Sequence, residues 1–186
     1  MMDKPWYRKL FRRPEKRSQQ TTQAQADSGN AEAQFSLGFQ FANGNGAEPD
    51  YAEAARWYLR AADQNHPLAQ FNLGVMFAGG QGVDHDEGKA MLWIQRAAQQ
   101  GDAGAQHNLG LRHRRASFEG LSKDARESNL EAYKWFRLAA AQGYRGSVTA
   151  YECVSQAMTR AEVAEGIDRA AKFVAVRSNP LAAAHE

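Results

Sequence analysis

The residue types that most often carry catalysis or bind metals are few and scattered in this chain. Its five histidines include no pair spaced four residues apart, and no cysteine cluster accompanies them, so the pattern of a zinc site is absent. Cys153 is the only cysteine, which excludes an intramolecular disulfide. No nucleophile and base stand in a recognisable catalytic pattern, and no glycine-rich phosphate loop follows a strand pattern. The sequence therefore predicts no metal, no cofactor and no enzymatic activity.

Binding chemistry is better represented, because Asn72 and Asn108 lie 36 residues apart in matching contexts. A primary amide both donates and accepts hydrogen bonds, which suits it to hold the backbone of a bound peptide. Nearby apolar residues would bury a side chain of that peptide, and an arginine would meet an acidic group. The residues predicted to line this concave, peptide-binding groove are Glu32, Phe35, Ser36, Phe39, Phe71, Asn72, Val75, His107, Asn108, Leu111 and Arg114.

A purely structural interpretation applies to some of the same residues. Phe35 and Phe71 would simply pack between adjacent helices, and for these two we prefer that interpretation. For Asn72 and Asn108 the binding and structural interpretations are equally supported. The three residues Trp57, Trp93 and Trp135 fall within apolar helical stripes, so they are assigned to the core and not to a ligand-stacking row.

These positions recur because the chain repeats itself. The hexapeptides 33–38, 69–74 and 105–110 share alanine, glutamine, leucine and glycine at the same four places. A second motif with alanines and a tryptophan follows each hexapeptide, and in the third copy it is delayed by six residues. A fixed period of this length is typical of stacked helix pairs. We place the repeats at 30–65, 66–101 and 102–143.

Each repeat is predicted to form two helices. Glycine inside a helix costs about 1 kcal/mol against alanine, so the recurrence of Gly38, Gly74 and Gly110 indicates that a neighbouring helix approaches closely there. Asp50 and Asp86 are predicted to cap the second helices of the first two repeats. Asn65, Gly101 and Gly143 are predicted to end the second helices in the left-handed conformation.

The third repeat and the segment after it depart from this pattern. The extra residues fall in 116–127, which we expect to be a loop that exposes Phe118 and Leu121, and Ser128 is expected to begin the next helix. Residues 144–178 are predicted to cap the array. Thr159 and Glu162 form a capping-box pattern there, and the closing helix is expected to bury the stripe Val163, Ile167, Ala170, Ala171 and Val174.

Charge is distributed unevenly along the chain. Residues 1–26 contain seven basic and two acidic residues, whereas the remainder contains 16 basic and 19 acidic residues. The mildly acidic remainder argues against nucleic-acid binding. We expect residues 1–26 to be a disordered basic tail, with an alternative role as a contact to an anionic membrane or a partner. That contact would use Trp6, Arg8, Lys9, Phe11, Arg12 and Arg13. Residues 179–186 are expected to be a second disordered tail. No apolar leader or span is evident, which favours a cytoplasmic location.

The repeated pattern resembles the Sel1-like repeat, over residues 30–143 with 144–177 as a cap. The resemblance rests on the recurring Ala-x-Ala-Gln-x-x-Leu-Gly, on the glycine-rich turns of the first two copies, and on Asp-x-x-x-Ala-x-x-Trp in the second halves. It implies an all-α, right-handed α/α solenoid of three helix pairs plus C-terminal capping helices, over 27–178. It also implies a bacterial or eukaryotic adaptor or scaffold that binds an unidentified protein or peptide. The alternatives are a membrane-peripheral adaptor and a regulatory subunit of an enzyme.

Overall fold

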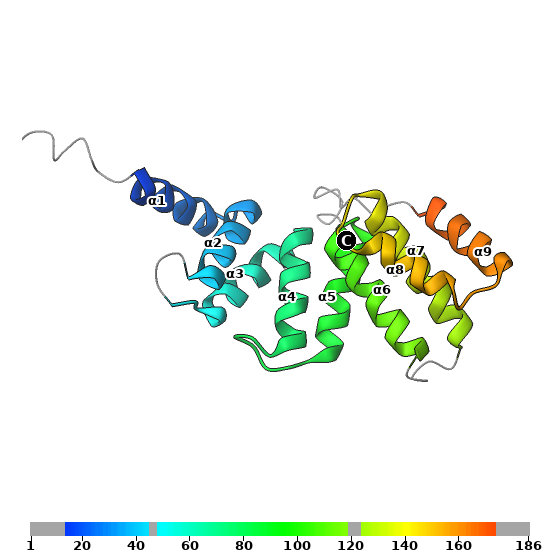
Figure 1. Ribbon diagram of the computed structural model, residues 1–186. Coiled ribbons are helices and arrows are strands. Elements are labelled where there is room, and N and C mark those ends of the chain that lie inside the picture. Colours follow the sequence, from blue (N-terminus) through cyan, green and yellow to red (C-terminus); the bar gives the residue numbers. More distant parts are fainter. Residues whose placement is uncertain (1–13, 45–47, 119–123, 174–186) are drawn as a thin grey trace, which may run out of the picture.

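The computed structural model describes residues 14–44, 48–118 and 124–173, and the regular structure within these ranges is α-helical. Helices α1 to α6 follow one another in chain order across an elongated molecule, and α8 and α9 both pack on α7 toward its other end (Figure 1). Their bounds are α1 Pro14–Asp27, α2 Ala31–Asn43, α3 Tyr51–Asp63, α4 Pro67–Gly79, α5 Glu87–Gln99, α6 Ala103–Phe118, α7 Ala125–Ala141, α8 Ser147–Ser155 and α9 Arg160–Ala171. Helices α2 to α7 form three pairs, and the predicted α/α solenoid is confirmed.

The helix ends are set by local chemistry that the sequence specified. The Asp50 carboxylate accepts a hydrogen bond from the Glu53 backbone N–H at 2.9 Å, and Asp86 caps α5 in the same way. Each cap satisfies a backbone donor that has no partner within the helix. Asn65, Gly101 and Gly143 adopt positive φ after the second helix of each pair, as predicted. These turns reverse the chain so that the next pair can stack.

Within each pair, the recurring glycine lets the two helices meet closely. A Cβ on Gly38 would lie 2.7 Å from the Tyr58 ring, and one on Gly110 would lie 2.6 Å from the Phe136 ring. For Gly74 the obstacle is Ile94, at 2.7 Å. These separations are too short for a side-chain carbon, so the predicted packing role of the glycines is confirmed.

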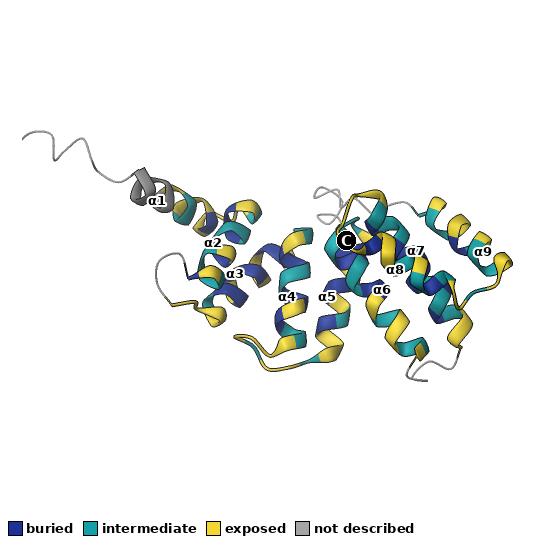
Figure 2. Ribbon diagram, viewed as in Figure 1, coloured by how far each residue is buried: buried dark blue, intermediate teal, exposed yellow. Residues whose placement is uncertain are grey.

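The core follows the line where paired and successive helices meet, which Figure 2 shows as buried bands along the array. Trp57, Trp93 and Trp135 are all buried, in agreement with their predicted role. Trp93 packs with Tyr58, Leu73 and several alanines from the preceding helices. Alanines at the contact positions keep the helices close, and the aromatic residues fill the remaining volume.

A buried glutamine in the first helix of each pair ties that pair to the preceding second helix. Gln70 is fully buried, and its Nε2 donates to the Ala62 carbonyl at 3.1 Å. Gln100 donates in turn to Gln70 Oε1 at 2.6 Å. The equivalent bonds from Gln34 and Gln106 reach Ala26 and Ala98. A buried amide requires such partners, which gives the recurring glutamine a structural reason.

The same bond shows that α1 occupies the place of a second helix. The Gln34 Nε2 donates to the Ala26 carbonyl eight residues earlier, as Gln70 does to Ala62. Ala26 is buried, and Gly29 after it has positive φ, as Asn65 has after α3. The structure therefore differs from the expected disordered tail over residues 14–26, because α2 supplies a packing surface for α1. The tail residues Trp6, Arg8, Lys9, Phe11, Arg12 and Arg13 lie outside the described residues.

The extra residues of the third repeat mostly lengthen its two helices. Helix α6 continues to Phe118, and α7 begins at Ala125 with Asp124 as its N-cap. The prediction that Ser128 begins this helix was wrong, since Ser128 is buried within α7. Phe118 is 92% exposed at the end of α6, and Leu121 lies outside the described residues.

The closing helix α9 packs against α7 and begins with the predicted Thr159–Glu162 capping box. Its buried centre is Gly166, where a Cβ would lie 2.6 Å from the Tyr133 ring. Ile167 is 41% exposed and Ala171 is also exposed, so the predicted apolar stripe was wrong at these two positions, and Val174 lies outside the described residues. The face of α9 that packs against α7 is therefore centred on Gly166 and not on the predicted stripe.

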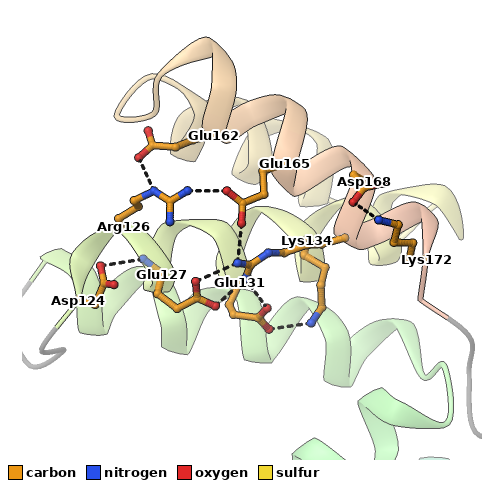
Figure 3. A network of polar contacts seen from close by, with 10 residues as sticks. Asp124, Arg126, Glu127, Glu131, Lys134, Glu162, Glu165, Asp168 and Lys172 are labelled. Atoms are coloured by element: carbon orange, nitrogen blue, oxygen red, sulfur yellow. Dashed lines mark hydrogen bonds and ion pairs between the residues drawn. The ribbon is translucent and has the colours of Figure 1, made fainter.

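Ion pairs add to this contact. Arg169 pairs with Glu127 of α7, and Arg126 of α7 pairs with Glu162 and Glu165 of α9 (Figure 3). Such partly exposed pairs contribute modestly to stability. None of the helices in the described ranges is long and apolar enough to span a lipid bilayer.

Candidate functional site

The first helices of the repeats and α8 contribute to a surface that we call the first-helix face (α2, α4, α6 and α8), and single side chains connect its neighbouring helices. Phe35 of α2 stacks on His66 before α4, with ring centroids 4.7 Å apart. Phe71 of α4 packs against Gly104 of α6, where a Cβ would lie 3.0 Å from the Phe71 ring. His107 of α6 lies 2.8 Å from the Ser147 hydroxyl of α8. Phe35, Phe71 and His107 are half-buried at the junctions between repeats, which is consistent with the packing role preferred for Phe35 and Phe71.

His66 links this face to the helix backbone. Its Nδ1 accepts the Ala69 N–H at 3.2 Å, so its Nε2 carries the proton and donates to Glu32 Oε2 at 3.0 Å. Glu32, predicted to line the groove, is therefore held beside the junction between α2 and α4.

His107 is enclosed by neighbouring rings. Its ring centroid lies 5.2 Å from that of Phe136 and 5.0 Å from that of Tyr144. Burial lowers the pKa of His107 and so favours its neutral imidazole. It serves as a packed neighbour of Ser147 at the end of the array. Within the described residues, no group of histidine, cysteine, aspartate and glutamate side chains is arranged to hold a metal ion.

An exposed apolar row runs along the first-helix face at one position of each repeat. Phe39 is 54% exposed, Val75 38% and Leu111 45%. All three belong to the predicted groove, and Ser36 lies half-buried one turn before Phe39 on α2. Large apolar side chains left exposed in register on three neighbouring helices are a feature of interaction surfaces.

Part of this row borders a cavity of about 200 Å³ between α2, α3 and α4. Phe39, Asn72 and Val75 line it together with Tyr51 and Tyr58 of α3. Burial raises the pKa of the Tyr58 hydroxyl, and a hydrogen bond with Asn72 acts in the opposite direction. The described residues that line the cavity include no charged side chain, so it is suited to an apolar group next to a hydrogen-bonding amide.

Asn108, which the sequence paired with Asn72, has a different environment. Its Oδ1 accepts a hydrogen bond from Arg112 Nε at 2.9 Å, and Arg112 also pairs with Glu87. The residue corresponding to Tyr58 in the preceding helix is Ile94, which has no hydroxyl. Asn72 and Asn108 are therefore not equivalent, although their sequence contexts match.

A second cavity, of about 460 Å³, lies between α6, α7 and α8. The predicted groove residue Arg114 lines it, and its Nη2 donates to Cys153 Sγ at 3.2 Å. Asn129, Gln156 and the exposed Phe118 also contribute to the lining. Thus Arg114 lies beyond the apolar row, in a polar and basic setting.

Several of the residues that line these cavities were not predicted from the sequence. Tyr58 has the spacing of the core stripe, which concealed that it also borders the cavity. Tyr51 is the first residue of α3 and Cys153 is half-buried on α8, and neither was among the predicted groove residues. The register of Cys153 with Val75 and Leu111 was available from the repeat alignment and would have placed it on this face.

The architecture defines an α/α solenoid, a class of protein that presents an extended surface built from stacked helix pairs. The Sel1 repeat profile matches residues 31–66, 67–102 and 103–144, within one residue of the predicted repeats. The chain belongs to the Sel1 repeat family, whose members are generally protein–protein interaction modules.

Two solved structures are similar to the chain along most of its length. One is c5321, a protective antigen present in uropathogenic Escherichia coli strains displaying an SLR fold. It is 32% identical with a TM-score of 0.63, and the match covers 81% of this chain but only 32% of that chain. The other is a Sel1 repeat protein from Oxalobacter formigenes, 37% identical with a TM-score of 0.60. This second match covers 73% of this chain and 98% of that chain. No curated protein matches the chain.

Proposed function

We propose that this chain is a non-catalytic adaptor that binds a peptide or a partner helix in a groove on its first-helix face. The observation that carries the proposal is the cavity between α2, α3 and α4, since three residues predicted to bind a ligand line it together. Phe39 and Val75 supply an apolar contact there, and Asn72 supplies an amide beside it.

The occupant that fits is an apolar side chain on an extended or helical segment. A cavity of about 200 Å³ has room for one aliphatic or aromatic side chain, and its neutral lining imposes no cost of burying an unpaired charge. The amide of Asn72 lies next to that position and can exchange a hydrogen bond with the ligand backbone. The exposed row through Leu111 extends the contact along the array.

A random peptide library displayed on phage and selected against the full chain tests this proposal. The expected result is enrichment of sequences with a recurrent aromatic or aliphatic residue. Their affinity should fall at least tenfold with Phe39→Ala, because truncating a central aromatic contact typically costs more than 1 kcal/mol. The matched control is Leu59→Ala, which removes a 42% exposed apolar side chain that does not line the cavity.

Enriched peptides that bind Phe39→Ala and Asn72→Ala variants as tightly as the unsubstituted chain would refute the groove. Circular dichroism of each variant would establish that the fold is retained, since Phe39 is exposed and its truncation should leave the helices intact.

A further inference from the structure

The two cavities on the first-helix face occupy equivalent places in the array. One lies where the first helix pair meets α4, and the other lies where the third pair meets α8. In the repeat alignment Asn129 takes the place of Tyr51, Val154 that of Met76 and Arg114 that of Ala42. A ligand that follows the first-helix face would therefore meet a second cavity of similar position and different chemistry.

The chemistry of the second cavity is basic and polar. Arg114 brings a guanidinium to it, Asn129 and Gln156 bring amides, and none of the described residues that line it is a carboxylate. Within the described part of the chain, the recorded side-chain contact of Arg114 is with the thiol of Cys153, which is a weak acceptor. By contrast, Arg112, Arg126 and Arg169 nearby are each paired with glutamates. Arg114 thus retains donors in a fork that matches a carboxylate.

The apolar part of the second cavity lies next to this guanidinium. Phe118 is 92% exposed at the end of α6, and Val154 and Ala157 of the α8 end complete the lining. An aromatic ring left in water beside an arginine that has no carboxylate partner in the described ranges favours a ligand with both an apolar and an anionic group.

We propose that this cavity binds an aspartate or glutamate side chain of an extended peptide, with an adjacent aliphatic residue placed against Phe118. The Arg114 guanidinium donates to the carboxylate, and the amides of Asn129 and Gln156 supply further donors. The inference rests on the proposed peptide-binding function and adds the acidic character of one ligand position.

Cys153 makes the proposal testable, because it lines the cavity and is the only cysteine of the chain. The probes are hexapeptides, acetylated and amidated, with Leu-Glu, Leu-Gln or Leu-Lys at the centre and one cysteine near the end. Each is supplied as its symmetric disulfide to the full chain under a fixed thiol buffer. The Cys153 thiolate attacks one sulfur, forms a mixed disulfide and releases one peptide thiol. Intact-mass spectrometry measures the mixed disulfide at equilibrium.

The expected result is an equilibrium constant about tenfold higher for the Leu-Glu peptide than for the Leu-Gln peptide, because a hydrogen bond to a charged group contributes free energy of that size. The Leu-Lys peptide should give the lowest value. In the Arg114→Gln variant the ratio of Leu-Glu to Leu-Gln should fall to about one. Comparing peptides within one variant cancels any change in the reactivity of the thiol itself. Arg145→Gln, an exposed residue outside the cavity lining, is the matched control and should keep the ratio.

Equal constants for the Leu-Glu and Leu-Gln peptides on the unsubstituted chain would overturn the proposal. So would a higher constant for a Leu-Gln peptide with a free C-terminal carboxylate than for the Leu-Glu peptide, since the occupant would then be a chain terminus. These outcomes do not bear on the binding proposed for the first cavity, because that proposal is tested separately, by the effect of Phe39→Ala on the affinity of peptides selected by phage display. Conversely, if Phe39→Ala did not weaken the selected peptides but the Leu-Glu peptide was still preferred, the first cavity would be refuted and the second would stand.

Discussion

Replacement of Gly74 by alanine tests whether close helix approach holds this array together. A Cβ on Gly74 would lie 2.7 Å from Ile94 Cγ1 and 3.1 Å from both the Ala90 carbonyl oxygen and the Ile94 nitrogen. Ile94 is fully buried, and the other two atoms belong to the backbone of α5. No side-chain rotation relieves the two backbone contacts, so α4 and α5 must move apart.

Two effects of opposite sign decide the magnitude. Alanine favours a helix interior over glycine by about 1 kcal/mol, whereas overpacking a core costs about 1–3 kcal/mol. Because the contacts involve backbone, we expect the upper part of that range and a net loss of about 1–2 kcal/mol. For a chain of this size, that corresponds to a melting temperature lower by roughly 2–8 °C.

Gly88→Ala is the matched control. Gly88 lies in the first turn of α5, and a Cβ there would approach only Asp86 Oδ1, at 3.3 Å. Here the helix propensity dominates, so stability should stay unchanged or rise by up to about 1 kcal/mol. Both variants would be measured by thermal and urea denaturation of the full chain. If Gly74→Ala proved as stable as the unsubstituted chain, the close-packing explanation of the recurring glycines would be refuted.

Three further predictions concern other contacts of the array. Trp93→Ala should cost about 3–5 kcal/mol, because a buried aromatic in the central repeat is lost, and a thermal melt within a few degrees of the unsubstituted chain would contradict it. Gln70→Leu should lower the free energy of unfolding by about 1–3 kcal/mol, since the Ala62 carbonyl loses a buried donor. Gln100→Ala removes a partly exposed amide and should cost less, and urea titration of both variants measures the difference. Hydrogen bonding to Arg169 lowers the pKa of Glu127, so this pair stabilises the fold above the unfolded carboxyl value of about 4.3 and the contribution is lost as pH falls through the folded pKa. The difference in melting temperature between the unsubstituted chain and Arg169→Ala should therefore shrink below about pH 4, and a difference independent of pH would refute the assignment.

Much of the fold was predictable because its determinants are local or recur. Asp50 and Asp86 cap helices through backbone groups three residues away, and Asn65 ends one through its own φ. The recurrence of Gly74 at a position unfavourable for a helix indicated a close contact before its neighbour was known. Each of these signals is carried by a short segment and repeated along the chain, so the periodic sequence is sufficient to define the helix pairs.

The helix lengths outside the regular repeats were less predictable. Residues 14–26 lack an apolar stripe, yet the bond from Gln34 to Ala26 and the contacts of α2 hold α1 in place. The insertion of the third repeat resembled a loop, but it extends α6 and α7, the two helices that make the most extensive contact among the described elements. In both cases a neighbouring helix supplies the stabilisation, and the segment itself contains no sign of it.

The sequence by itself determined the repeats, the caps of the first two second helices, the close glycines and the tryptophan core, and it indicated one surface for binding. Only the tertiary structure decided which residues of that surface remain available to contact a ligand. Asn72 borders a cavity because Tyr58 lies opposite it, whereas Asn108 is held by Arg112. Phe35 is half-buried against His66, while Phe39 one turn later is exposed. The physical reason is that the environment of each position depends on residues of the adjacent helix, and these differ between repeats whose own motifs are alike.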